Sequence, residues 1–78
     1  MITSEQIRSA RAALDWSIEQ LADATAISSR TIIRMEATAG VPSSTKANLI
    51  TIKTALEAAG IEFIGTPDDR PGIRINTK

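Results

Sequence analysis

The sequence predicts a mostly α-helical fold, a bundle of four to five helices followed by a short C-terminal β-hairpin or pair of strands. Three observations support this prediction. Apolar side chains recur at helical spacing through residues 3–59, in segments that begin with Ser or Thr. Gly60 then provides a stop. Residues 61–78 instead alternate apolar and polar side chains in two short runs, as half-buried strands do. We therefore expect a helical domain at 1–60 and a β-strand extension at 61–78.

The composition of the chain excludes several classes of protein. The 78 residues contain no Cys and no His, which excludes disulfides, thiol catalysis, most nucleophilic triads and nearly all zinc sites. Only Trp16 and Phe63 are aromatic, and a chain of this length has a thin core that a partner subunit can help to stabilise. No apolar run exceeds four residues, and no basic region precedes an apolar stretch at the N-terminus. We expect a cytoplasmic protein without a membrane segment, enzymatic activity, metal or other cofactor.

The first predicted helix begins after Thr3. Thr3 and Gln6 have the spacing of a capping box, in which a hydroxyl and a Gln satisfy free N–H groups at a helix start. The apolar side chains that follow lie on one helical face: Ile7, Ala10 and Leu14.

The second and third predicted helices are short and adjacent. Ser17 and Gln20 repeat the capping-box spacing, which predicts a second helix over residues 18–24. A tight connection follows, and Ser28 is a suitable N-cap for a third helix over residues 29–37. Two short helices joined by such a turn form a helix-turn-helix unit, here at residues 17–37. The apolar contact points of this unit are Leu21, Ile27, Ile32 and Met35.

The fourth predicted helix is the longest. Ser43 or Ser44 is expected to cap it, and it is expected to run to about Ala59 before Gly60. Two strands follow at residues 61–64 and 72–75, with a turn-rich segment at residues 65–71 between them.

The middle third of the chain is locally basic, although the net charge is zero. Residues 28–53 contain Arg30, Arg34, Lys46 and Lys53 but a single acidic residue, Glu36. A binding face for nucleic acid requires local and not global positive charge. Ordinary scatter of surface charge is the alternative interpretation.

Four stretches of the sequence resemble a known family. They are Leu14 to Ala22 (LDWSIEQLA), Ile27-Ser28, Thr31 to Glu36 (TIIRME) and Ala55 to Ile64 (ALEAAGIEFI). Together they are similar to the Cro/cI-type repressors, also called the Xre family, whose fold is a helical bundle that docks on B-DNA. Two positions depart from the family pattern. Ile18 stands where Gln is usual, and Ala26 stands where Gly is usual because the backbone there prefers positive φ.

The resemblance implies that the third helix is the recognition helix, whose N-terminal residues reach base edges in the major groove. Arg can donate two hydrogen bonds to guanine, and Ile33 is either a contact for a thymine methyl group or a partly buried residue against the fourth helix. The base-contact candidates are Ser28, Ser29, Arg30, Ile33 and Arg34. The phosphate-contact candidates are Ser17, Thr31, Ser43, Ser44, Thr45 and Lys46.

The resemblance also implies a structural ion pair between Arg11 of the first helix and Glu36 at the end of the third. In that case Glu36 does not repel DNA. Trp16 is expected to pack between the first two helices.

Two functions are compatible with these features. The first is a sequence-specific DNA-binding regulator that binds a near-palindromic operator as a homodimer, completed by strand pairing at Phe63, Ile64, Ile73 and Ile75. An intrachain hairpin folded onto the fourth helix is the alternative for these strands. The second function is a protein-binding module on the same scaffold, such as an antitoxin or anti-activator. The expected partners are accordingly double-stranded DNA, a second copy of the chain and, in the second case, another protein.

Overall fold

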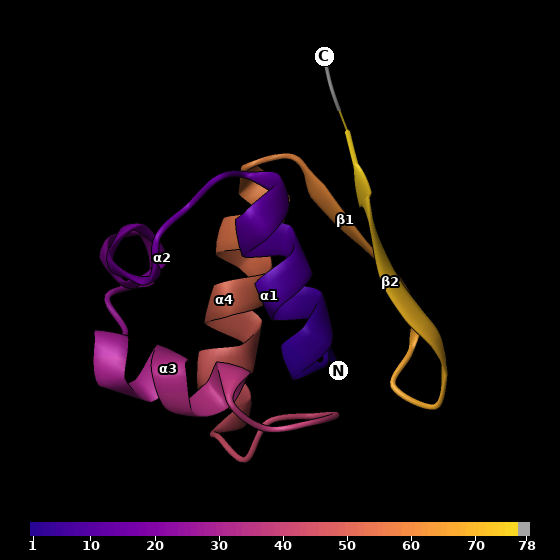
Figure 1. Ribbon diagram of the computed structural model, residues 1–78, viewed down its shortest axis with the longest axis horizontal. Helices are drawn as coiled ribbons and strands as arrows, with labels where there is room; N and C mark the ends of the chain where they lie inside the picture. Colours follow the sequence, from indigo (N-terminus) through magenta and orange to yellow (C-terminus); the bar gives the residue numbers. More distant parts are fainter. Residues whose placement is uncertain (77–78) are drawn as a thin grey trace.

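The computed structural model describes residues 1–76, which form four helices and two strands (Figure 1). The predicted mostly α fold with a C-terminal hairpin is confirmed at this level. The elements are α1 (Ser4–Ala13), α2 (Ile18–Thr25), α3 (Ser29–Glu36), α4 (Lys46–Ala58), β1 (Ile61–Thr66) and β2 (Asp69–Ile75). The predicted extension at 61–78 thus has its last two residues outside the described part of the chain.

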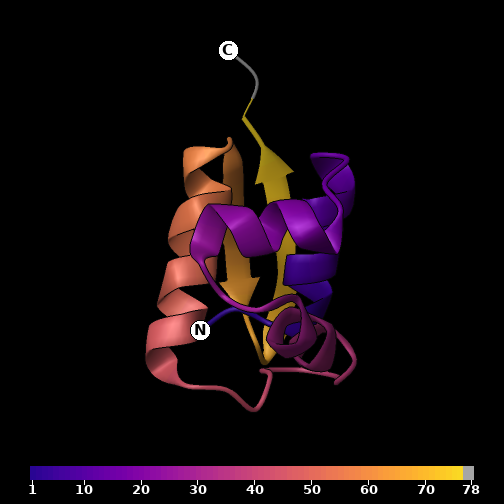
Figure 2. The same cartoon turned by 90° about the vertical axis from the view of Figure 1, so that its left-hand side faces the viewer.

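The elements stack in three layers. In Figure 1, α1 and α4 lie side by side in the middle, with α2 and α3 on one side and the hairpin on the other. Figure 2 shows α2 and α3 in front, α4 and α1 at the two edges, and the hairpin behind them. The fully buried aliphatic side chains come from every layer: Ile7, Ala10, Leu21, Ile32, Ile52, Leu56 and Ile61. Trp16 is half-buried and packs against this core.

Local capping signals fix most of the helix starts. Thr3 with Gln6 and Ser17 with Gln20 both form complete capping boxes, as predicted. Ser28 caps α3, also as predicted. The prediction for α4 was wrong by one or two residues, because Thr45 is the N-cap and its Oγ1 accepts a hydrogen bond of 3.1 Å from Asn48 N. Three consecutive hydroxyl residues offer equivalent local caps.

The turn between α2 and α3 requires a left-handed residue. Ala26 adopts φ +60° and ψ +20°, and its N–H donates to Ala22 O at 2.8 Å. Thr25 Oγ1 accepts a hydrogen bond of 3.2 Å from Ile27 N and so closes the turn. The expected positive φ at Ala26 is therefore present. Because Ala has a Cβ atom, this left-handed backbone conformation is less favourable for it than for Gly.

The hairpin pairs within the chain, with Ile61 opposite Ile75 and Phe63 opposite Ile73. Its turn is shorter than the predicted segment 65–71, because the strands continue to Thr66 and from Asp69. A bulge follows Ile64, where Gly65 has φ +75° and a Cβ would lie 2.3 Å from Arg70 O. Because Gly65 adopts this conformation and the register shifts at the bulge, the strand pairing extends into the segment 65–71, whose residues are typical of a turn.

The inner face of the hairpin covers α1 and α4. Phe63 and Ile73, which were predicted to form a dimer contact, are half-buried and pack against the core, so part of each side chain is already covered within its own chain. Ile64 is half-buried, and Ile75 is 54% exposed. Gln6 joins the hairpin to α1, because its Nε2 donates to Ile64 O at 3.1 Å and to Gly72 O at 2.8 Å. Its Oε1 accepts from Thr3 N at 2.8 Å, so one buried amide is both a cap and a tether.

Candidate nucleic-acid interface

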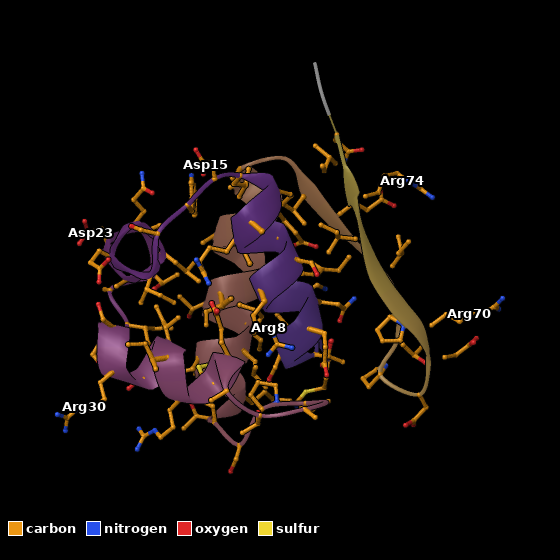
Figure 3. All side chains as sticks on the ribbon, in the orientation of Figure 1. Arg8, Asp15, Asp23, Arg30, Arg70 and Arg74 are labelled. Atoms are coloured by element: carbon orange, nitrogen blue, oxygen red, sulfur yellow. The ribbon has the colours of Figure 1, made fainter. Side chains whose placement is uncertain are left out.

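The outer face of α3 carries an exposed stripe at helical spacing. Arg30, Ile33, Arg34 and Ala37 are exposed, whereas Ile32, Met35 and Glu36 are buried. Ile33 is 56% exposed, so the interpretation that it is partly buried against the fourth helix was wrong. Figure 3 shows Arg30 projecting away from the body of the molecule. We call Arg30, Ile33, Arg34 and Ala37 the outer stripe of α3.

The two arginines of the outer stripe are not engaged elsewhere. Among residues 1–76, neither Arg30 nor Arg34 forms an ion pair or a side-chain hydrogen bond. They lie four residues apart, so both guanidinium groups project from one side of the helix. Two free cations on one helical face are the arrangement that a major-groove contact uses.

The hydroxyl groups at the start of α3 are held together. Ser28 Oγ accepts a hydrogen bond of 3.2 Å from Thr31 N and lies 2.9 Å from Thr31 Oγ1. Ser28 is exposed, whereas Ser29 and Thr31 are half-buried. Of the predicted contacts at this end, Ser28 and Arg30 are therefore the more accessible.

The predicted ion pair between α1 and α3 is formed and is bidentate. Arg11 Nη2 lies 2.8 Å from Glu36 Oε1, and Arg11 Nε lies 2.9 Å from Glu36 Oε2. The hydrogen bond to the Glu36 carboxylate raises the pKa of Arg11. Arg11 Nη1 also donates to Trp16 O at 2.9 Å, which ties the pair to the start of α2. Glu36 is only 7% exposed.

This pair changes the charge of the surface. Glu36 is the only acidic residue in residues 28–53, and it is buried and neutralised by Arg11. The exposed charges of that segment are therefore all positive: Arg30, Arg34, Lys46 and Lys53.

Two further side chains of α1 hold the C-terminal end of α3. Ser4 Oγ donates to Met35 O at 2.6 Å, and Arg8 Nη1 donates to Glu36 O. Thr38 Oγ1 donates to Met35 O at 3.1 Å. Figure 3 shows Arg8 between α1 and α3. These bonds satisfy carbonyl groups that a helix end leaves free, so α1 fixes the position of α3. These bonds could not be predicted from the sequence, since no local pattern links residues about thirty positions apart.

The predicted phosphate contacts outside α3 lie at two other helix starts. Ser17 is the exposed N-cap of α2, and its Oγ accepts from Gln20 N at 3.1 Å. Ser43, Thr45 and Lys46 are exposed at the start of α4, whereas Ser44 is half-buried and its Oγ accepts from Asn48 Nδ2. In the structure, each of these residues is a helix cap or an ordinary surface residue. The free N–H groups beside them suit an anion.

One feature opposes anion binding on this side. Figure 3 shows Asp23 of α2 projecting on the same side of the molecule as Arg30. Asp23 is exposed, so its carboxylate lowers the positive potential near the outer stripe.

Neither a cluster of metal ligands nor a membrane-spanning helix is found in the part of the chain that the structure describes. Across residues 1–76, no three acidic side chains lie together in a group that could hold a metal ion. Each helix in that range is too short or too polar to cross a bilayer.

No protein-family model matches the sequence, and no curated protein matches it significantly.

Proposed function

We propose that this chain is a sequence-specific DNA-binding regulator of the Cro/cI type, with α3 as the helix that enters the major groove. The observation that carries the proposal is the outer stripe of α3, where two unpaired arginines stand on a short helix that α1 holds in place. The major groove admits one α-helix, and Arg is the commonest specific partner of guanine there.

The residues divide into two roles in this proposal. Arg30 and Arg34 donate to guanine O6 and N7, each worth about 1–3 kcal/mol of discrimination, and Ile33 contacts a thymine methyl group. Ser28 and Ser29 contact base edges at the N-terminal end of α3. Contacts from Ser17, Thr31, Ser43, Ser44, Thr45 and Lys46 to phosphates set the position of the protein on the duplex.

A homodimer on a near-palindromic operator is part of the proposal. Half-sites then lie about 34 Å apart, one helical turn of DNA. Since Phe63 and Ile73 face the core of their own chain, the contact would use Ile64, Ile75 and the free edges of the hairpin.

Fluorescence anisotropy tests the proposal directly. The protein is titrated against the duplex immediately upstream of its own coding sequence, because small repressors often control themselves, and against a scrambled duplex. The series is repeated at several salt concentrations with Arg34→Ala. A matched control is Arg70→Ala, an exposed arginine at the hairpin turn on the far side of the molecule from α3 (Figure 3).

Binding that is specific, salt-dependent and lost in Arg34→Ala but retained in Arg70→Ala supports the proposal. The slope against salt then counts the phosphate contacts. Binding that is equally weak for both duplexes, or unchanged in Arg34→Ala, refutes base reading by α3.

A further inference from the structure

A second surface, separate from the outer stripe of α3, has the form of a binding groove. It opens between the first two residues and α4 and has a volume of about 210 Å³. Ile2 and Leu49 form its floor and are each 3% exposed. Met1 and Ile50 form its walls and are 65% and 57% exposed. Ile2, Leu49 and their exposed neighbours thus form one continuous apolar surface, of the kind that marks contact sites.

The groove has a positive charge at each end. Lys46, Leu49, Ile50 and Lys53 follow one another at i, i+3, i+4 and i+7, so they form one stripe along α4. The two lysines are separated by seven residues, about 10 Å along the helix axis. They are the two charged residues among the six that line the groove.

Neither lysine is buried or strongly paired within residues 1–76. Lys46 forms no ion pair there. Lys53 Nζ lies 3.8 Å from Glu57 Oε2, but both side chains are about half exposed, and exposed pairs of this kind contribute little. Both ammonium groups are therefore available to a ligand.

We propose that this groove binds an amphipathic helix of another protein, one that carries carboxylates at i and i+7 and large aliphatic side chains at i+3 and i+4. The aliphatic side chains would fill the space above Ile2 and Leu49, and the carboxylates would meet Lys46 and Lys53. Because the contacting residues have the same spacing on both helices, the two helix axes can lie nearly parallel, as they do in common helix pairs.

The charges distinguish this partner from a second copy of the chain. A two-fold contact between two α4 helices through Ile50 would bring the lysines of both copies together, and like charges at an interface are unfavourable. An acidic partner instead places a carboxylate opposite each of the two ammonium groups, so the contact becomes attractive. The groove, unlike the outer stripe of α3, therefore selects a protein partner of opposite charge.

The test uses a synthetic peptide and no DNA, so it is independent of the proposed function. The probe is a fluorescein-labelled helix of about 14 residues, Ala- and Gln-rich, with Glu at i and i+7 and Leu at i+3 and i+4. A second peptide carries Lys in place of both Glu. Binding is followed by anisotropy with the wild-type chain, with Ile50→Asp and with the double variant Lys46→Glu/Lys53→Glu. The control is Val41→Asp, which changes another exposed aliphatic side chain that does not line the groove.

The wild-type chain is expected to bind the Glu peptide and not the Lys peptide. Ile50→Asp is expected to weaken binding about tenfold or more, and Val41→Asp by less than about twofold. The double variant is expected to reverse the preference, which a merely structural role of the lysines would not produce. Circular dichroism checks that each variant is folded. We expect all of them to fold, because the substituted side chains are exposed.

Three results would overturn the proposal. The first is equal or absent binding of the two peptides by the wild-type chain. The second is a dimer in sedimentation that Ile50→Asp dissociates, because a second copy would then occupy the groove. The third is saturable binding of decanoate that displaces the Glu peptide, because a small amphiphilic anion would then be the natural class of ligand.

Discussion

Replacing Gln6 by Glu is expected to loosen the hairpin from the helices. The Gln6 side chain is 3% exposed and makes three hydrogen bonds, one accepted from Thr3 N and two donated to Ile64 O and Gly72 O. A carboxylate keeps the first of these bonds and loses both donors. It also places a negative charge against two carbonyl oxygens.

The magnitude follows from these bonds. Each lost bond is worth about 1 kcal/mol, and leaving buried acceptors unpaired adds to this, so the expected cost is about 2–4 kcal/mol at neutral pH. A domain of this size has a total stability of about 4–12 kcal/mol. The midpoint of thermal unfolding should therefore fall by roughly 10–30 °C, at about 4–8 °C for each kcal/mol.

The cost of Gln6→Glu should depend on pH with a definite sign. Burial and the two carbonyl groups raise the pKa of the introduced carboxyl group in the folded state above its unfolded value. The variant is thus closest to wild type when the carboxyl group is protonated, at about pH 4, and loses stability as the pH rises. Urea denaturation at several pH values measures this difference.

Gln20→Glu is the matched control. Gln20 occupies the same capping-box position in α2, with its Oε1 2.7 Å from Ser17 N, but it is exposed. Glu also serves well at that position, so the change should be within about 0.5 kcal/mol. Equal effects of Gln6→Glu and Gln20→Glu would refute the view that the Gln6 amide holds the hairpin.

Three further substitutions test other contacts. Ala26→Gly should stabilise the chain by about 0.5–1 kcal/mol in urea denaturation, because glycine adopts φ +60° without strain. Ala24→Gly, at an exposed position within α2, should instead destabilise it, and a loss in both variants would contradict the argument. Glu36→Gln should cost about 1–3 kcal/mol by the same measurement, because it leaves the guanidinium of Arg11 without its carboxylate; no loss would show that the pair adds nothing to stability. Glu5 has a pKa below its ordinary value, because its own backbone N–H, then the N–H of Gly40 and the charge of Arg8, favour its ionised form. The stability that Glu5 supplies is therefore present above about pH 5 and lost as the pH falls, so wild type and Glu5→Gln should converge in acid; a constant difference would contradict this.

Local signals predicted the helices well because a helix start is decided by a few neighbouring residues. The capping boxes at Thr3 and Ser17 lie within four residues each, and both are present. The cap of α4 was misassigned because Ser43, Ser44 and Thr45 are locally equivalent. Packing of the apolar face of α4 selects among them, and that information lies elsewhere in the chain.

The hairpin could be predicted from the sequence only in part. Its turn was predicted too long because the Gly65 bulge and the positive φ of Arg70 let both strands run through turn-forming residues. The inward orientation of Phe63 and Ile73 was predicted only as the alternative, in which the hairpin folds onto the fourth helix. Alternation shows that a strand has two faces, but it does not show which one α1 and α4 will cover.

The contacts that position the candidate interface were the least predictable part. The exposed arginines of α3 could be expected from helical periodicity alone. The bonds of Ser4 and Arg8 to the end of α3 join residues 31 and 28 positions apart. Polar residues on the first turns of a helix look like ordinary surface residues until their partner is known.

The hydrogen bonds and the ion pair that join α3 to α1 all lie at the C-terminal end of α3. Ser4, Arg8 and Arg11 hold its C-terminal end, whereas Arg30 stands near the opposite end. The eight residues of α3 span about 12 Å, so a tilt of about 5° at the attachment moves the far end by about 1 Å. Hydrogen bonds tolerate only about half that displacement. If α3 reads bases as proposed, small changes in the packing of α1 would thereby alter which bases it distinguishes, and substitutions in α1 would change the sequence preference.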